Sequence, residues 1–492
     1  MADPEGSPMK QIRRQMTVPA SLDSANPIHA RGGHLFNAAL FGGGLTGISY
    51  LALNWPPWAQ AVITLLGMIA FVGLWRLKFS GRLSFADPGI FFMFVICVYT
   101  AIPMLTFEYY DYTFGPKTDT RLYHIVLDQG LVADVWLCSS LAMAGFGAAY
   151  LALRAPRMGA LPKTMPKGAI GALWVGLAIA VIINIIAFLG RGGSGDYADE
   201  YLFFRTLPVW VVQVINILSM MFQVSVFGLF AYYLAAKRML VAWSLLIASL
   251  AFFAVTTDSR SLLVIVAGGF FILRDHLIKR FSPTMLAVLA VVGLATFLAL
   301  GFIREGELAI SDIAGRNEFV AVFVTALDVQ QLYITGSTLD MNTSLLVGDL
   351  VRLIPQQLLG FEKIDPATWY VANFYPYYAE SGGGLAFGMV SESVLGGGGF
   401  VALVRGLALG GLIASSINFL SRRASIWRLI VYVWLFINVY QSFRDTTFSL
   451  VGRFAFQFAP GLLLVILLSQ LLALRVSAPG RPAIGKGKAG PA

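Results

Sequence analysis

The stretch GAIGALWVGLAIAVIINIIAFL, residues 168–189, decides the fold class. It runs for 22 residues without a charged side chain. A helix of about 20 apolar residues crosses the roughly 30 Å hydrocarbon core of a bilayer, and it satisfies its own backbone polar groups. The stretch therefore predicts a membrane-spanning helix rather than a strand or a soluble segment.

Runs of this kind recur along the chain and predict an all-α integral membrane protein of about twelve transmembrane helices. They cover approximately 35–53, 58–75, 89–107, 131–153, 168–189, 208–236, 239–257, 262–279, 284–303, 396–419, 427–443 and 455–474. The composition agrees, because 57% of the residues are hydrophobic and 12% are charged, whereas about a quarter of a soluble domain is charged. The mean hydropathy is +0.74.

The basic residues predict the orientation of these helices. If the N-terminus lies inside and the spans alternate, the inner segments hold 23 of the 35 basic residues but 5 of the 26 acidic ones. Cytoplasmic loops carry such an excess of Lys and Arg. Both termini are therefore predicted to be cytoplasmic. The net charge of +9 is explained by this asymmetry and does not indicate a nucleic-acid partner.

The same reading divides the chain into five parts. Residues 1–34 form a cytoplasmic segment, 35–303 hold helices 1–9, 304–395 form a long periplasmic loop subdomain, 396–474 hold helices 10–12, and 475–492 form a disordered cytoplasmic tail. Within the long loop, 343–354 (TSLLVGDLVRLI) has leucines at helical spacing. This spacing predicts an amphipathic helix on the membrane surface or over the bundle.

Charged residues close to apolar runs are candidate site residues, because the bilayer makes them costly. Arg260 follows Asp258 in a short outer turn at the start of a helix, where it either binds phosphate oxygens or caps a hairpin. Arg304 lies at a helix exit, where an arginine also snorkels to the interface. Arg444 and Arg453 bracket a short outer loop.

Two further charges lie near the apolar run 396–419. Arg405 lies inside the run and needs a partner there, either a phosphate or Glu392, unless the helix starts later and the side chain snorkels. Glu392 lies in an apolar, glycine-rich stretch, which suits a proton acceptor or a structural hydrogen-bonding group that holds the glycine loop.

Other side chains suggest binding surfaces or exclude classes of site. Tyr375, Tyr377 and Tyr378 lie in the stretch WYVANFYPYYAESGGG (369–384) and suit a membrane interface or stacking on sugar rings. The spacing of Glu305 and Glu307 alone does not predict a metal site. No nucleotide-binding loop is present, so no cofactor is expected. Cys97 and Cys138, the two cysteines, lie in apolar runs and imply no disulfide framework.

Three local patterns resemble the Wzy-type oligosaccharide repeat-unit polymerases, also called O-antigen polymerases, of bacterial envelopes. They are TTDSRSLLVIV (256–266), IPQQLLGFEK (354–363) and FGMVSESVLGGGGFVALVRGLALG (387–410). The interval from Arg304 to Gly315 also fits an Arg-x10-Gly pattern of that family. The resemblance is diffuse but covers most of the membrane region.

The resemblance implies a GT-C-like glycosyltransferase of the bacterial inner membrane. Such an enzyme transfers a glycan from undecaprenyl diphosphate to a sugar hydroxyl of a second lipid-linked repeat, and a chain-length regulator protein is a further partner. Glu392, Arg260 and Arg444 are then the expected catalytic residues. The diphosphate-binding residues expected are Arg260, Arg304, Arg316, Arg405, Arg444 and Arg453.

Two other functions stay open. An O-antigen ligase of the same superfamily usually has a histidine in its long outer loop, and 304–395 contains none. A flippase or other glycan transporter predicts paired halves and polar residues at the bilayer midplane. No paired halves are visible in this sequence. The polymerase is therefore the favoured hypothesis, and the ligase and transporter remain the alternatives.

Overall fold

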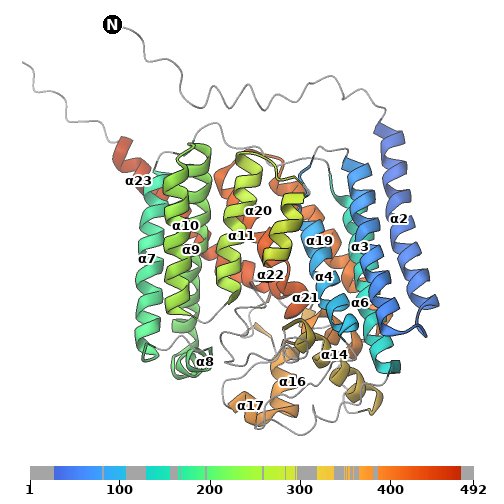
Figure 1. Ribbon diagram of the computed structural model, residues 1–492. Coiled ribbons are helices and arrows are strands. Elements are labelled where there is room, and N and C mark those ends of the chain that lie inside the picture. Colours follow the sequence, from blue (N-terminus) through green and yellow to red (C-terminus); the bar gives the residue numbers. More distant parts are fainter. Residues whose placement is uncertain are drawn as a thin grey trace, which may run out of the picture.

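The computed structural model describes residues 27–79, 83–106, 129–155, 165–166, 168–193, 197–257, 260–282, 284–293, 295, 318–336, 348–349, 351, 353–354, 358–359, 365–380 and 386–477. Within these ranges the regular elements are all helices (Figure 1). The longer ones are α2 (Pro27–Leu51), α3 (Pro57–Phe79), α4 (Pro88–Leu105), α6 (Gln129–Leu153), α7 (Ala169–Gly190), α9 (Val209–Ala235), α10 (Met239–Thr256), α11 (Arg260–Leu277), α14 (Glu318–Ile334), α19 (Gly399–Leu420), α20 (Ile426–Asn438) and α23 (Ala459–Ser477). The shorter ones are α8 (Tyr197–Thr206), α16 (Pro366–Phe374), α17 (Pro376–Glu380), α18 (Gly388–Leu395), α21 (Gln441–Arg444), α22 (Ser449–Arg453) and the π-helical turn η4 (Phe454–Phe458).

Nine helices among the described residues are long and apolar enough to cross a membrane. They correspond to nine of the predicted runs, including the opening stretch, which forms α7. In the other three runs, Leu35–Leu51 and Thr284–Gly293 are shorter apolar helices, and α11 carries Arg260, Arg274 and Asp275. The prediction of a helical membrane protein is thus confirmed, and the count of twelve stays a prediction.

Side-chain contacts identify one end of the helix bundle. Lys78 near the end of α3 donates to the Leu151 carbonyl near the end of α6. Arg154 after α6 lies 3.6 Å from Asp87, which caps the start of α4. Asn418 near the end of α19 donates to the Leu153 carbonyl at 2.7 Å. In Figure 1, α2 begins and α23 ends toward this same upper end of the bundle.

The closest helix pair, α6 and α19, is held by glycines. A Cβ added at Gly406 would lie 2.3 Å from the carbonyl oxygen of Ala142, and one added at Gly410 would lie 2.5 Å from that of Phe146. On the other side, a Cβ at Gly145 would lie 2.3 Å from the Leu403 carbonyl. Small residues four apart let helix backbones approach in membranes, where dispersion contacts stabilise the association.

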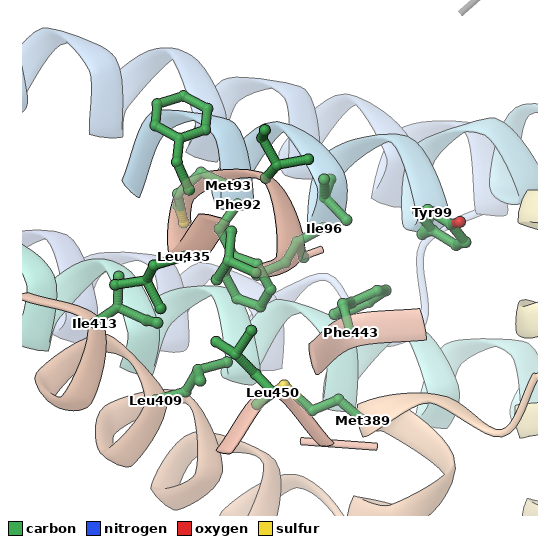
Figure 2. Packing of buried hydrophobic residues seen from close by; sticks show 14 of the residues in the cluster. Phe92, Met93, Ile96, Tyr99, Met389, Leu409, Ile413, Leu435, Phe443 and Leu450 are labelled. Atoms are coloured by element: carbon green, nitrogen blue, oxygen red, sulfur yellow. The ribbon is translucent and has the colours of Figure 1, made fainter. Parts of the chain in front are cut away.

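The lower end of the bundle is built differently, because part of the predicted outer loop belongs to the core. Tyr99 of α4 packs edge-on against Phe319 of α14 at 4.7 Å and against Phe443 of α21 at 5.9 Å. The buried residues of α14 and α18 join the same apolar cluster as those of the long helices. Figure 2 shows part of this apolar cluster, with labelled side chains from α4, α18, α19, α20, α21 and α22.

The sequence analysis did not predict α14 as an element. Its 17 residues are apolar but too few to span a bilayer. The helix instead packs its buried face on α4, α6 and α18. The predicted amphipathic helix at 343–354 lies mostly outside the described residues, and within it Gly348 and Asp349 are helical.

Candidate functional site

A glycine turn at the lower end of the bundle lies at the start of the predicted run 396–419 and separates α18 from α19. Gly397 and Gly398 have φ values of 120° and 80°, a region that side chains with a Cβ rarely adopt. The Gly398 amide donates to the Ser393 carbonyl at 2.7 Å and closes the turn. This turn ends α18 and starts α19, so that Glu392 and Arg405 come from different helices.

Glu392 and Arg405 form the centre of a buried cluster with Thr447 and Asp349, which we term the Arg405 cluster. The Nη1 of Arg405 lies 2.7 Å from Asp349 Oδ2 and 3.2 Å from Glu392 Oε2. It also donates to Thr447 Oγ1 at 3.2 Å. Thr447 donates to Glu392 Oε2 twice, from its amide at 2.8 Å and from its hydroxyl at 2.6 Å.

The other two guanidinium nitrogens of Arg405, Nε and Nη2, are buried without a hydrogen-bond partner among the described residues. The Arg405 side chain is 4% exposed. Leaving buried donors unpaired is costly. These two nitrogens form the side-on edge of the guanidinium, which binds carboxylates and phosphates in a bidentate manner. Glu392, one of the two partners predicted for Arg405, therefore does pair with it. The edge formed by Nε and Nη2 is left to bind an anion.

A second group of charges lies beside the first. One carboxylate oxygen of Asp445 accepts a hydrogen bond from Arg444 Nη1 at 3.2 Å, and the other accepts one from Arg453 Nη2 at 2.9 Å. We term these three residues the Asp445 cluster. The Asp445 carbonyl accepts the Gly388 amide at 2.7 Å, which fixes this loop to the start of α18. The two predicted loop arginines are thus brought together, and the loop that holds them also carries Thr447.

The Asp445 cluster differs from the Arg405 cluster in its access to solvent. The side chains of Arg444 and Arg453 are 31% and 42% exposed. Both guanidinium groups are therefore accessible without a rearrangement of the helix core. The immediately following turn, η4, is π-helical, and the carbonyl of Phe456 in that turn accepts a hydrogen bond from Gln213 of α9. Such turns are frequent at functional sites.

Of the other predicted residues, three have a described backbone only and two lie outside the described residues. Arg260 is the first residue of α11, as the sequence predicted for a helix start, but its side chain is not described. Tyr377 and Tyr378 belong to α17, again without described side chains. Arg304 and Arg316 lie outside the described residues. Their expected roles in binding diphosphate or sugar stay predictions.

Tyr375 has a different environment from the one expected of a sugar-stacking residue. Its side chain is 3% exposed, and its hydroxyl donates to Asp328 Oδ2 at 2.8 Å. Tyr370 donates to the same oxygen, and Asp328 itself is 1% exposed. Burial, and next the charge of Asp328, raise the pKa of Tyr370 well above its usual value. Tyr375 therefore ties α16 and the following turn to α14 and offers no open ring face to a sugar.

The fold brings to this end four polar residues to which the sequence had assigned no role. Thr447, Asp349 and Asp445 bind the predicted side chains, as described above. The fourth is Arg191 after α7, which donates to the Thr256 carbonyl at 2.6 Å and pairs with Glu200 of α8. Arg191 thereby ties the end of α7 to the end of α10, four residues before Arg260 in the sequence. The acidic partners were visible as charges near apolar runs, but only the fold shows which arginine each one meets.

Comparisons of the chain with protein-family models, curated proteins and solved structures gave no match. The resemblance to repeat-unit polymerases therefore rests on the local patterns 256–266, 354–363 and 387–410. The structure describes all of 387–410, which holds Glu392 and Arg405 of the Arg405 cluster. It describes 256–266 except for residues 258 and 259, with Arg260 as the first residue of α11, and residues 354, 358 and 359 of the remaining pattern.

Proposed function

We propose that the chain is a membrane glycosyltransferase that polymerises undecaprenyl-diphosphate-linked oligosaccharide repeat units at the periplasmic face of the bacterial inner membrane. The observation that carries the proposal is the side-on edge of Arg405, a buried pair of N–H groups without a hydrogen-bond partner among the described residues. Arg444 and Arg453 lie on the adjoining loop. A departing diphosphate needs such fixed donors where its charge develops.

The proposed reaction is a single glycosyl transfer. The acceptor hydroxyl oxygen forms a bond to the anomeric carbon of the donor, and the bond from that carbon to the diphosphate oxygen breaks. The electron pair leaves with the lipid diphosphate, and a carboxylate of the site accepts the hydroxyl proton. Because the donor is already activated, the residues have only to hold two lipid-linked substrates in register and stabilise the leaving group.

The orientation belongs to the same proposal, with both termini cytoplasmic and the Arg405 cluster at the periplasmic end. A cysteine in place of the exposed Asn54, in a predicted outer loop, should react with a membrane-impermeant maleimide in intact spheroplasts. A cysteine in place of the exposed Arg423 should react only after the membrane is opened. Cys97 and Cys138 are buried and should give little background. The reverse labelling pattern would overturn the orientation.

The function is tested with purified protein in lipid nanodiscs and undecaprenyl-diphosphate-linked repeats, where the product is a ladder of polymer lengths. We expect the parent protein to form polymer, and Arg260→Ala and Arg444→Ala each to abolish it while the protein stays in the membrane. Arg423→Ala, an exposed arginine outside both clusters, is the matched control and should polymerise like the parent. Persistence of long polymer in both site variants would refute the diphosphate assignment.

A deletion strain separates the polymerase from the other two functions. If the gene product polymerises repeats, its loss should remove long surface polymer and leave single repeats attached to the surface lipid. Loss of all surface glycan would instead favour a ligase or a flippase. Accumulation of lipid-linked polymer inside the membrane would point to the ligase.

A further inference from the structure

Two carboxylates share one nitrogen of Arg405, and their surroundings differ. Asp349 lies 2.7 Å from Nη1 and has a side chain that is 15% exposed. Glu392 lies 3.2 Å from the same nitrogen and is 1% exposed. The site therefore contains one carboxylate that solvent reaches and one that is enclosed by protein.

The contacts of Glu392 mark it as an anchor. Its Oε2 accepts the Thr447 amide, the Thr447 hydroxyl and Arg405 Nη1. To take a proton on that oxygen, Glu392 would have to release the backbone of the loop that carries the Asp445 cluster. Its side chain is 1% exposed, against 15% for Asp349, so Asp349 is the more accessible of the two carboxylates. Its geometry thus serves to hold Arg405 and the loop together.

Asp349 has the access that a proton acceptor requires. It lies in the predicted outer loop 304–395 and pairs with Arg405 of α19. A general base must come within hydrogen-bonding distance of the proton that it takes. The ion pair to Arg405 fixes the carboxylate close to the guanidinium whose other edge, Nε and Nη2, would meet the diphosphate.

We propose that Asp349 accepts the proton of the attacking sugar hydroxyl and that Glu392 is a positioning residue. The inference rests on the proposed glycosyl transfer and assigns its base. As the hydroxyl oxygen bonds to the anomeric carbon, its proton passes to an Asp349 carboxylate oxygen, and the bond to the diphosphate oxygen breaks. Asp349 then returns the proton to solvent, to which it is open, and no other reactant is needed.

The test measures single-turnover rates over a range of pH with the full chain in nanodiscs and undecaprenyl-diphosphate-linked repeats. We expect Asp349→Asn to lower the rate by about 10²–10⁴-fold and to remove the loss of activity on the acid side of the profile. Added formate should restore part of the rate of Asp349→Ala, because it supplies a carboxylate at that place. Asp349→Glu should keep part of the activity.

Glu392→Gln should behave differently if it only positions Arg405. We expect a smaller loss of rate, an acid side of the pH profile like that of the parent, and no rescue of Glu392→Ala by formate. Asp365→Asn is the matched control, an exposed carboxylate that caps α16 by accepting from Thr368, a role that asparagine also fills. It should have the rate and profile of the parent.

The outcomes separate the two proposals. Parental rate and pH profile in Asp349→Asn, or rescue by formate at position 392 instead of 349, would overturn the assignment of the base while polymerisation by the parent stands. Absence of polymer from the parent with active donor would remove the proposed function and this inference with it. Gel filtration of each variant establishes that the protein is folded, and Asp349→Glu keeps the test decisive if Asp349→Asn aggregates.

Discussion

Replacing Gly406 with alanine tests whether the close packing of α6 and α19 builds the lower end of the bundle. The added Cβ would lie 2.3 Å from the Ala142 carbonyl oxygen and 2.9 Å from the Phe146 nitrogen, and both are backbone atoms that cannot rotate away. Ordinary contact begins near 3.4 Å, so the two helices must separate by roughly 1 Å. Gly411, on the same helix, offers a matched control, because its added Cβ meets only the Leu153 side chain at 3.4 Å.

Two opposing effects determine the expected change in the free energy of unfolding. A gap of 0.5–1 Å forfeits about a quarter to a half of the dispersion energy of the contacts that it opens, and overpacking of a core costs about 1–3 kcal/mol. Alanine favours a helix over glycine by at most about 1 kcal/mol, and this gain applies at both positions. We therefore expect Gly406→Ala to lower the free energy of unfolding by about 1–3 kcal/mol, and Gly411→Ala to leave it unchanged or slightly raised.

The assay is unfolding in mixed micelles as the fraction of denaturing detergent rises, followed by far-UV circular dichroism. Equal free energies of unfolding for the two variants would refute the reasoning, since the glycines would then be interchangeable with alanine. A second readout is polymer formation. Arg405 directly precedes Gly406, so a shift of α19 moves its guanidinium away from Glu392 and Thr447, and Gly406→Ala should lose more activity than Gly411→Ala.

Three further predictions concern other parts of the molecule. Asp87→Ala should lower the free energy of unfolding by about 3–5 kcal/mol in the same assay, because it leaves the buried Arg154 without its ion-pair partner. The double variant Asp87→Ala, Arg154→Met removes both charges and should lose less stability than Asp87→Ala alone; an equal or larger loss in the double variant would contradict this. The raised pKa of Tyr370 means that the folded protein holds the phenol proton more tightly than the unfolded chain. Stability should therefore be complete below the usual tyrosine pKa of about 10 and fall as the pH rises above it, and Tyr370→Phe should flatten this fall in thermal melts. Cys97 and Cys138 are buried, so a water-soluble maleimide should modify them only after unfolding. Mass spectrometry that detects the maleimide on either cysteine of the native protein would contradict this prediction.

The sequence predicts the long helices well, because a single physical demand creates the pattern. An apolar run in a bilayer has no water to satisfy its backbone, so the helix is the solution that a single segment provides. This demand does not fix the residue at which each helix begins. The run 396–419 forms one helix, α19, as predicted, and the positive φ values at Gly397 and Gly398 explain why it begins only at Gly399.

The helix α14 was missed for the opposite reason. Its 17 residues are too short for a span and carry Asp328, so the segment was assigned to the outer loop. Its stability comes from partners far away in sequence. Tyr370 and Tyr375 satisfy the buried Asp328, and the apolar face packs on α4, α6 and α18. Tertiary contacts of this kind leave no local signal.

The basic members of the candidate site and Glu392 were predicted from the sequence, whereas Asp349 and Asp445 were given no role. Glu392, Arg405, Arg444 and Arg453 stand out because each charge lies near apolar sequence. Asp445 stood next to Arg444 in the sequence, but its hydrogen bond to Arg453 depends on the turn formed by α22. The contact of Asp349 with Arg405 joins positions 56 residues apart, and no spacing rule predicts it.

The acidic members change what the arginines can do. Within the described residues, Arg405, Arg444 and Arg453 face the carboxylates of Glu392, Asp349 and Asp445, so the two clusters together carry no net formal charge. They supply directed N–H groups rather than a surplus of positive charge.

A diphosphate carries negative charge that must be balanced in a site that excludes water, since an unpaired buried charge is costly. The surplus must then come from arginines beyond these two clusters, and the sequence predicts Arg260, Arg304 and Arg316 for that role. Arg191 donates to the Thr256 carbonyl and so holds the end of α10, four residues before Arg260 in the sequence. Arg260→Ala should therefore weaken the binding of lipid diphosphate more than Arg453→Ala does, because the charge of Arg453 is already paired with Asp445. Equal losses in the two variants would contradict this.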